Sequence, residues 1–223
     1  MLNAPDSASE VLFGGVSQDI ALGDAAVLRE VLERDRAKRP ADPPESPFLV
    51  VLSGLPGTGK SHFAQQLGEL VPLLVLESDR LRKVLVPRPK YTPGESRQLF
   101  SACHLLLEEY LNLGLGVLFD ATNLTQAFRQ PLYQIAERTS ASVVMIRLTA
   151  SREIVRQRLT DRVAGRHPSD FSDAGWLVYS RMYPHEEAIQ RHHLTVDSSY
   201  DTSWALDTVV GMIDSAAHAG SSE

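Results

Sequence analysis

Hydrophobic residues recur along this chain in two spacings: short uninterrupted runs, and stripes with the period of a helix. Uninterrupted runs are typical of strands buried on both faces of a parallel sheet. Stripes of helical period, such as the one that begins at Leu99, lie between the runs. The alternation predicts an α/β three-layer sandwich with a parallel five-stranded sheet and right-handed crossovers. The predicted strands are Phe48–Leu52, Leu73–Leu76, Val117–Phe119, Val143–Leu148 and Leu194–Val196.

The N-terminal part of the chain has a different pattern. Residues 24–38 place Ala25, Leu28, Val31 and Leu32 on one face, which predicts an amphipathic helix. Residues 39–47 contain four prolines and predict an extended linker. We therefore expect an N-terminal arm, residues 1–47, and a main domain, residues 48–223. The arm could pack on the domain, cap a site on it, or join copies of the chain into a homo-oligomer.

A glycine-rich stretch, Gly54–Ser61, follows the first predicted strand and precedes a predicted helix. It matches the Walker A phosphate-binding pattern, and we call it the P-loop. Its glycines let backbone N–H groups turn inward around phosphate oxygens, and the helix N-terminus adds partial positive charge. Lys60 is expected to bridge the β- and γ-phosphates, and Ser61 to ligate Mg²⁺. The predicted ATP-binding residues are Gly54, Pro56, Gly57, Thr58, Gly59, Lys60, Ser61 and His62.

Two carboxylates end predicted strands at the edge where parallel sheets bind ligands. Asp120 follows the third strand and is expected to be a second Mg²⁺ contact. Ala121 comes next, where ATPases that activate water often place a glutamate, which argues against a mechanical ATPase. Asp79 follows the second strand and is expected to accept the proton of an attacking hydroxyl group.

Arg82 lies three residues after Asp79, on the same helical face, where it could hold an acceptor. The alternative is that Asp79 lies in an ordinary first helical turn with arginines at the surface. Because Ser78 could serve as the helix cap, we expect Asp79 to be available for chemistry.

Arginines are concentrated before a Gly- and Pro-containing segment, residues 165–170. We predict a lid over ATP, at about residues 158–172, with Arg158 and Arg162 facing the transferring phosphoryl group. The alternative is a solvated basic helix face paired with Glu153 and Asp161. The arginines concerned are Arg152, Arg156, Arg158, Arg162 and Arg166.

Charge and cysteine content restrict the class of partner. Twenty-two basic against 28 acidic residues give a net charge of −6, which argues against broad, non-specific binding of nucleic acid but allows a narrow arginine-lined channel. The single cysteine, Cys103, excludes an internal disulfide framework. With neither a signal-peptide pattern nor an apolar run near the ~20 residues of a membrane helix, we expect a cytoplasmic protein without membrane contact.

From about Phe48 to Glu187 the chain resembles the kinase domains of polynucleotide 5′-hydroxyl kinases and the related AAA_33/zeta-toxin-like P-loop kinases. The resemblance implies that Asp79 is the general base, that Arg82 grips an acceptor phosphate, and that Arg162 contacts the transferring phosphate, with Arg158 as the second lid candidate. In the phage member of this group the acidic residue directly precedes Thr-Asn-Leu, whereas in this chain Ala121 lies between Asp120 and Thr122. The motifs are Gly54–Ser61, Asp79-x-x-Arg82, Lys90-Tyr91-Thr92, Asp120–Leu124 with Arg129, and Arg158-x-x-x-Arg162.

The sequence therefore predicts an ATP- and Mg²⁺-dependent kinase that transfers the γ-phosphoryl group to a hydroxyl group. The acceptor is either a polynucleotide 5′-end or a small metabolite. The alternative is a non-catalytic ATP-binding switch or an ATPase module, which would keep the P-loop without needing Asp79.

Overall fold

The protein is described by a computed structural model over residues 16–38, 44–165 and 174–220. The strands are β1 (Phe48–Ser53), β2 (Leu74–Glu77), β3 (Gly116–Asp120), β4 (Ser142–Thr149) and β5 (Leu194–Asp197). The helices are α2 (Gln18–Lys38), α3 (Lys60–Leu70), α4 (Ser78–Leu85), α5 (Pro93–Asn112), α6 (Gln126–Arg138), α7 (Arg152–Val163), α8 (Trp176–Met182) and α9 (Ser203–Gly220), with a 3-10 turn, η1 (Tyr183–His185).

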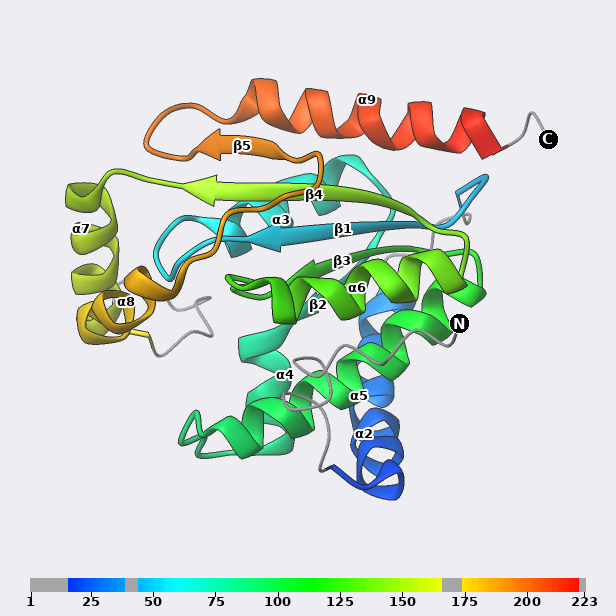
Figure 1. Ribbon diagram of the computed structural model, residues 1–223, viewed down its shortest axis with the longest axis horizontal. Coiled ribbons are helices and arrows are strands. Elements are labelled where there is room, and N and C mark those ends of the chain that lie inside the picture. The colour runs from blue at the N-terminus through cyan, green and yellow to red at the C-terminus, as the bar shows by residue number, and fades with distance from the viewer. Residues whose placement is uncertain (1–15, 39–43, 166–173, 221–223) are drawn as a thin grey trace, which may run out of the picture.

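The five strands form one parallel sheet in the order β2-β3-β1-β4-β5. All the pairings are parallel, as the arrows of β1, β4 and β5 illustrate in Figure 1, so the carboxyl ends of the strands share one edge of the sheet. Strand β1 lies in the middle, and each of its residues is buried, as its uninterrupted hydrophobic run predicted. The predicted parallel α/β sandwich is confirmed.

Helices cover both faces of the sheet and divide the interior into two main cores. One core lies between the sheet and α2, α4, α5 and α6, and contains alternate β1 residues such as Leu49 and Val51. The other lies under α3 and α9 and contains Val50 and Leu52. Figure 1 shows α9 and α3 on one side of the sheet and α4, α5 and α6 on the other. This three-layer arrangement leaves the carboxyl edge of the sheet for the loops that follow the strands.

Helix α5 begins as the sequence predicts, whereas α4 does not. Thr92 caps α5 by accepting a hydrogen bond from the Glu95 amide at 3.2 Å, and Pro93 is the first helical residue. The Glu95 carboxylate reaches back to the amides of Lys90 and Tyr91, at 2.9 and 2.7 Å. The expectation that Ser78 caps α4 is wrong, because the helix begins at Ser78 itself.

Helix α2 belongs to the same core as the sheet. It begins at Gln18, six residues before the predicted start, and it buries Ala21, Ala25, Leu28 and Leu32. Leu28 and Leu32 are fully buried in the core that also contains Leu49 and Val51 of β1. Of the roles left open for the arm, packing on the domain is therefore the one that α2 fulfils. Residues 1–15 and the linker residues 39–43 lie outside the described part of the chain.

Cys103 also lies in this core. It is fully buried, and burial raises the pKa of its thiol to about 12. A thiol held in this neutral state acts as a small hydrophobic side chain, as expected from its place on the apolar face of α5.

The variant Leu28→Ala tests how strongly α2 is integrated. We expect it to lower the free energy of unfolding by about 2–5 kcal/mol, measured by chemical denaturation, because it opens a cavity in a fully buried site. The control is Val27→Ala on the same helix, where the side chain is 47% exposed and the change should be within about 0.5 kcal/mol. Equal effects of the two variants would contradict the burial of this helix.

Candidate active site

The P-loop connects β1 to α3 at the carboxyl edge of the sheet. Gly57 and Gly59 adopt φ angles of +82° and +84°, a left-handed conformation that side chains with a Cβ rarely adopt. A Cβ at Gly57 would also lie 3.1 Å from Val155 and Leu159 of α7. The loop is thus pressed against α7 at a point where only glycine fits without strain.

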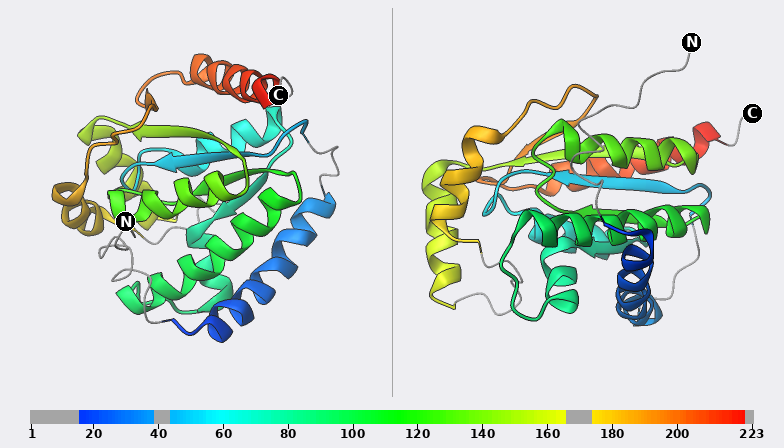
Figure 2. Two further views of the ribbon diagram at one scale, coloured as in Figure 1. Left: turned by 45° about the vertical axis from the view of Figure 1, so that its right-hand side comes forward. Right: turned by 60° about the horizontal axis from the view of Figure 1, so that its bottom comes forward.

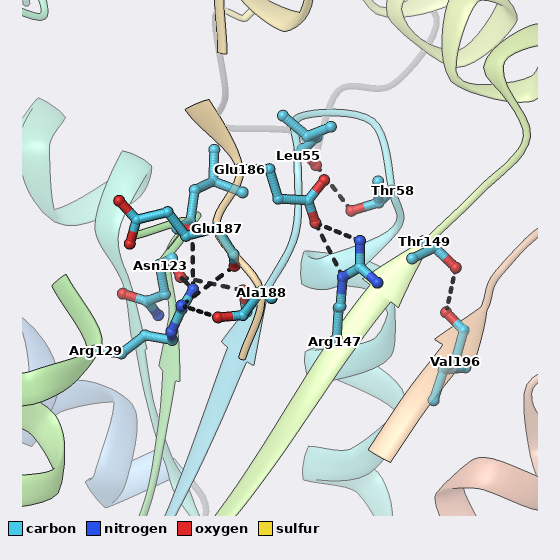
Figure 3. A network of polar contacts seen from close by, with 12 residues as sticks. Leu55, Thr58, Asn123, Arg129, Arg147, Thr149, Glu186, Glu187, Ala188 and Val196 are labelled. Atoms are coloured by element: carbon cyan, nitrogen blue, oxygen red, sulfur yellow. Dashed lines mark hydrogen bonds and ion pairs between the residues drawn. The ribbon is translucent and has the colours of Figure 1, made fainter. Parts of the chain in front are cut away.

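The carbonyl oxygen of Leu55 organises the inside of this loop. It accepts hydrogen bonds from the Thr58 amide at 3.3 Å, the Thr58 hydroxyl at 2.8 Å and the Lys60 ammonium group at 3.1 Å. Figure 3 shows the Leu55–Thr58 contact. Pro56, which is buried between them, has no N–H to donate and fixes φ instead. The Lys60 side chain is therefore held against the loop that it is predicted to serve.

The first turn of α3 supplies backbone donors. The first amides of a helix have no hydrogen-bond acceptor within the helix. In α3 the first helical hydrogen bond runs from the Phe63 amide to the Gly59 carbonyl at 3.0 Å. The amides of Lys60, Ser61 and His62 are thereby oriented along the positive end of the helix dipole. The side chain of His62 is exposed, so its predicted part in ATP binding rests on its amide.

Two polar side chains hold the outer side of the P-loop. Ser198, just after β5, donates to the Thr58 carbonyl at 2.8 Å. Arg158 of α7 donates to the Gly57 carbonyl at 3.2 Å and to the Ser198 hydroxyl and carbonyl at 2.9 and 2.8 Å. Because N–H and C=O point in opposite directions across a trans peptide, holding the Thr58 carbonyl outward turns the Gly59 N–H inward.

Arg158 therefore packs against the backbone of the P-loop and stabilises its conformation. Burial lowers the pKa of its guanidinium group, while the charge of Asp197 opposes that shift. Its predicted role as a lid arginine stays a prediction, and its observed contacts are with the loop backbone.

Ser61 and Asp120, predicted as Mg²⁺ contacts, are brought together. The Ser61 hydroxyl donates to the Asp120 carboxylate at 2.6 Å. Asp120 is 3% exposed and ends β3 in register with Leu52 of β1 and Glu77 of β2. A hydroxyl and a carboxylate oxygen at the mouth of a phosphate-binding loop are the hard oxygen donors that Mg²⁺ prefers, so the residues fit this ion.

The segment after Asp120 is tied to β1 and the P-loop. The Gly54 amide donates to the Thr122 carbonyl at 3.0 Å, and the Asn123 side chain donates to the Leu52 carbonyl at 2.8 Å. The Ser53 hydroxyl donates to the Asn123 carbonyl at 3.1 Å. These bonds fix where the P-loop leaves its strand.

Arg129 of α6 anchors the segment after Asp120 through hydrogen bonds to its backbone. Its fully buried guanidinium group donates to the carbonyls of Asn123, Leu124, Glu187 and Ala188 at 2.9–3.2 Å (Figure 3). Burial lowers the pKa of the group. The four carbonyls satisfy Nη1 and Nη2, while Nε has no hydrogen-bond partner among the described residues. The motif arginine thus cross-links two loops at the edge of the sheet.

Asp79 and Arg82 both lie on helix α4, which directly follows β2. Among the described residues, the Asp79 carboxylate has no hydrogen bond or ion pair. Arg82 is 6% exposed, yet two of its nitrogens, Nε and Nη1, have no hydrogen-bond partner in the described chain. The third, Nη2, makes a long 3.4 Å contact with Ser96, and the Tyr91 ring lies 5.1 Å from the guanidinium carbon. A buried cation with unsatisfied donors is costly unless an anion binds it.

The predicted lid is only partly described. Arg162, at the end of α7, donates to the Ala174 carbonyl at 3.3 Å. Arg152 and Arg156 stack on the Trp176 ring at 5.3 and 5.6 Å, so they line the α7–α8 contact. Arg166 and the rest of residues 166–173 lie outside the described residues. The roles of these arginines at phosphate stay predictions.

The partners of Ser198 and Arg129 could not be inferred from side-chain patterns along the chain. Ser198 directly follows the last strand, which places it at the ligand-binding edge, but its contact with Thr58 spans 140 residues. The partners of Arg129 at Glu187 and Ala188 lie 58 and 59 residues away and are backbone atoms, which leave no pattern in side chains.

Within the three described ranges, no helix is long and apolar enough to cross a membrane. In the same residues, no group of three or more His, Cys, Asp or Glu side chains is arranged to hold a metal ion.

Comparison with known proteins places this site in a family. The AAA_33 family model, described as an AAA domain, matches residues 49–184, more than half of the chain. The sheet and its flanking helices also match solved structures of P-loop kinases, which confirms a kinase-like P-loop NTPase fold.

Three solved structures illustrate the likeness. Kti12 from Chaetomium thermophilum in complex with ADP-AlF3 has a TM-score of 0.61 and 19% identity, over 74% of this chain and 98% of that one. APS kinase CysC from Mycobacterium tuberculosis with AMPPNP and APS has a TM-score of 0.57 and 15% identity, over 77% and 99%. A gluconokinase from Sinorhizobium meliloti has a TM-score of 0.53 and 16% identity, over 77% and 94%. At these identities the likeness concerns the fold.

The variant Gly57→Ala tests the geometry of the P-loop. We expect it to raise the Kd for ATP at least about tenfold, or about 1.4 kcal/mol, because the new methyl group must displace the loop from α7. Isothermal titration calorimetry measures this. The control is Gly114→Ala, which carries the same left-handed strain of about 1–2 kcal/mol at φ +77° but has open space around it. If Gly57→Ala lost stability as the control does and bound ATP normally, the assignment of the loop would fail.

Proposed function

The chain belongs to the AAA_33 family of AAA domains, and we propose that it is an ATP-dependent kinase whose acceptor carries an anionic group beside the reacting hydroxyl. Different residues support the binding of ATP, the phosphoryl donor, and the binding of the acceptor. The acceptor residues are the ones that distinguish phosphoryl transfer from ATP hydrolysis.

On the donor side, the amides of the P-loop and of the first turn of α3 bind the phosphates of ATP, and Lys60 moves from the Leu55 carbonyl to the β- and γ-phosphates. Arg158 and Ser198 keep the loop in its binding shape. Ser61 and Asp120 would hold Mg²⁺, which supplies charge neutralisation at the phosphates. Arg162 is the candidate for the cation that the lid brings to the transferring group.

On the acceptor side, the arrangement of Asp79 and Arg82 favours transfer over hydrolysis. Asp79 follows β2 by two residues, and Glu77 at the end of β2 is in register with Asp120. The unpaired Asp79 carboxylate thus lies at the same edge of the sheet as Ser61 and Asp120, and it takes the proton of the acceptor hydroxyl. That oxygen bonds to the γ-phosphorus, the bond from the γ-phosphorus to the bridging oxygen breaks, and ADP leaves. Ala121, 2% exposed, provides no carboxylate for activating water.

Arg82 restricts the class of acceptor. Its unpartnered nitrogens are suited to a phosphate, sulfate or carboxylate group, because a charge-assisted contact removes the cost of burying them. A 5′-hydroxyl nucleotide with a 3′-phosphate has this chemistry, and so does a small phosphorylated or sulfated metabolite. The solved APS kinase complex, with AMPPNP and APS bound together, supports this fold's ability to hold two such ligands.

The variant Asp79→Asn tests the proposed base. We expect kcat for transfer from radiolabelled ATP to fall about 10²–10⁴-fold, with the Kd for ATP unchanged because Asp79 has no contact with the P-loop. The screen uses 5′-hydroxyl oligonucleotides beside a panel of anionic metabolites and their neutral counterparts. Unchanged transfer would remove Asp79 from the mechanism. Wild-type protein that binds ATP and transfers to no acceptor would favour the nucleotide-dependent switch.

The variant Arg82→Gln tests the acceptor anion. We expect the KM for an anionic acceptor to rise about 10–100-fold, the loss of one charge-assisted contact of about 1.5–3 kcal/mol. Transfer to a neutral counterpart should change little. Arg88→Gln, on the exposed part of the α4–α5 loop, is the matched control for loss of charge. An equal rise for charged and neutral acceptors would show that Arg82 does not read an anion.

A further inference from the structure

Helix α2 lies outside the matched residues 49–184 and yet packs against the acceptor side of the molecule. It contacts α5, α4 and β2. Figure 2 shows α2, in blue, running beside the green α5 in its left view. The residues proposed to bind the acceptor are on α4, so a helix from outside the family domain supports the helix that carries them.

Helix α4 needs such support. It has eight residues, and helices this short have little stability of their own in water. Leu81, between the two functional residues of α4, is 1% exposed and lies in the same core as Leu28 and Leu32 of α2. This apolar contact fixes how far α4 stands from the sheet, but it does not by itself fix the rotation of α4 about its axis.

A polar contact between α2 and α4 can fix that rotation. Arg80 of α4 forms an ion pair with Asp35 of α2, with 2.5 Å between Nη2 and Oδ2, although the two groups are not aligned as a hydrogen bond. The other Asp35 oxygen, Oδ1, lies 3.4 Å from Lys38 on α2 itself. Successive residues of a helix are rotated by about 100°, so Asp79 and Arg82 project within about 60° of each other. Arg80 then projects about 130° away from their mean direction. The ion pair therefore holds α4 from the side opposite its acceptor face.

We infer that Asp35 is a positioning residue for the acceptor site: through Arg80 it sets the rotation of α4, and thereby the direction of Asp79 and Arg82. This inference rests on the proposed function. Both partners are about 28–29% exposed, so the pair contributes modestly to overall stability. Its effect is expected on geometry, since a displacement of about 1 Å at a reacting group costs up to about 10²-fold in rate.

The chain offers a matched control on the same helix. Arg29 of α2 binds Glu109 of α5 through two contacts of 2.8 and 2.6 Å, with both side chains 37–39% exposed. This pair also ties α2 to the domain but does not reach α4. Glu109→Gln therefore breaks a comparable ion pair without releasing the acceptor helix.

The test compares Asp35→Ala, Arg80→Ala, Glu109→Gln and the exchange Asp35→Arg with Arg80→Asp. We expect Asp35→Ala and Arg80→Ala to lower kcat/KM for the acceptor about five- to twentyfold, the size expected when a reacting group is misplaced, with the Kd for ATP unchanged. The control Glu109→Gln should change kcat/KM by no more than about twofold. The exchange variant should recover most of the loss, because it restores the ion pair in reverse.

Hydrogen exchange of the α4 amides supplies a readout that does not depend on transfer. It should be faster in Asp35→Ala than in wild type or Glu109→Gln, since α4 has lost an anchor. Unchanged exchange in α4, or equal kinetic losses in Asp35→Ala and Glu109→Gln, would overturn the inference. If the wild-type protein transfers to no acceptor, the proposed kinase function fails, and the exchange result still decides whether Asp35 anchors α4.

Discussion

A phosphate-binding loop that turns its amides inward must turn carbonyl groups elsewhere, and each of those oxygens needs a donor. In this protein the Leu55 carbonyl is satisfied from within the loop by Thr58 and Lys60. The Thr58 carbonyl accepts a hydrogen bond from Ser198 in the loop after β5, and the Gly57 carbonyl accepts one from Arg158 of α7. The arrangement of α7 and of the loop after β5 around the sheet follows from this requirement.

The parts of the fold that depend on local sequence could be predicted. Uninterrupted apolar runs located the ends of all five strands to within one residue, because a strand buried on both faces tolerates few polar residues. The start of α5 could also be predicted, because its capping residues Thr92, Pro93 and Glu95 are neighbours in the sequence. The error at Ser78 was also local: β2 passes directly into α4, so the residue with the better capping side chain is already helical.

The parts that depend on distant backbone atoms could not be predicted. Ser61 and Asp120 were each predicted as a Mg²⁺ contact, Ser61 from the Walker A pattern and Asp120 from its place at the end of a strand, and the structure brings the two side chains together. The carbonyls of Glu187 and Ala188 that Arg129 binds, and the contact between Asp35 and Arg80, are set by how loops and helices meet in space. The role of α2 shows the same limit: its apolar stripe predicted a helix, but the stripe does not say which partner covers it.

The contacts of Ser198 and Arg129 also govern the order in which the protein can be made. Thr58 leaves the ribosome 140 residues before Ser198, and Arg129 precedes two of its partner carbonyls, those of Glu187 and Ala188, by 58 and 59 residues. Until those later segments arrive, the P-loop carbonyl of Thr58 lacks this donor and the segment beside Asp120 lacks its cross-link. Contacts so distant along the chain form late, because closing a long loop of chain costs entropy before the contact returns energy. A nascent chain that has already produced its Walker A sequence therefore does not yet possess a nucleotide site.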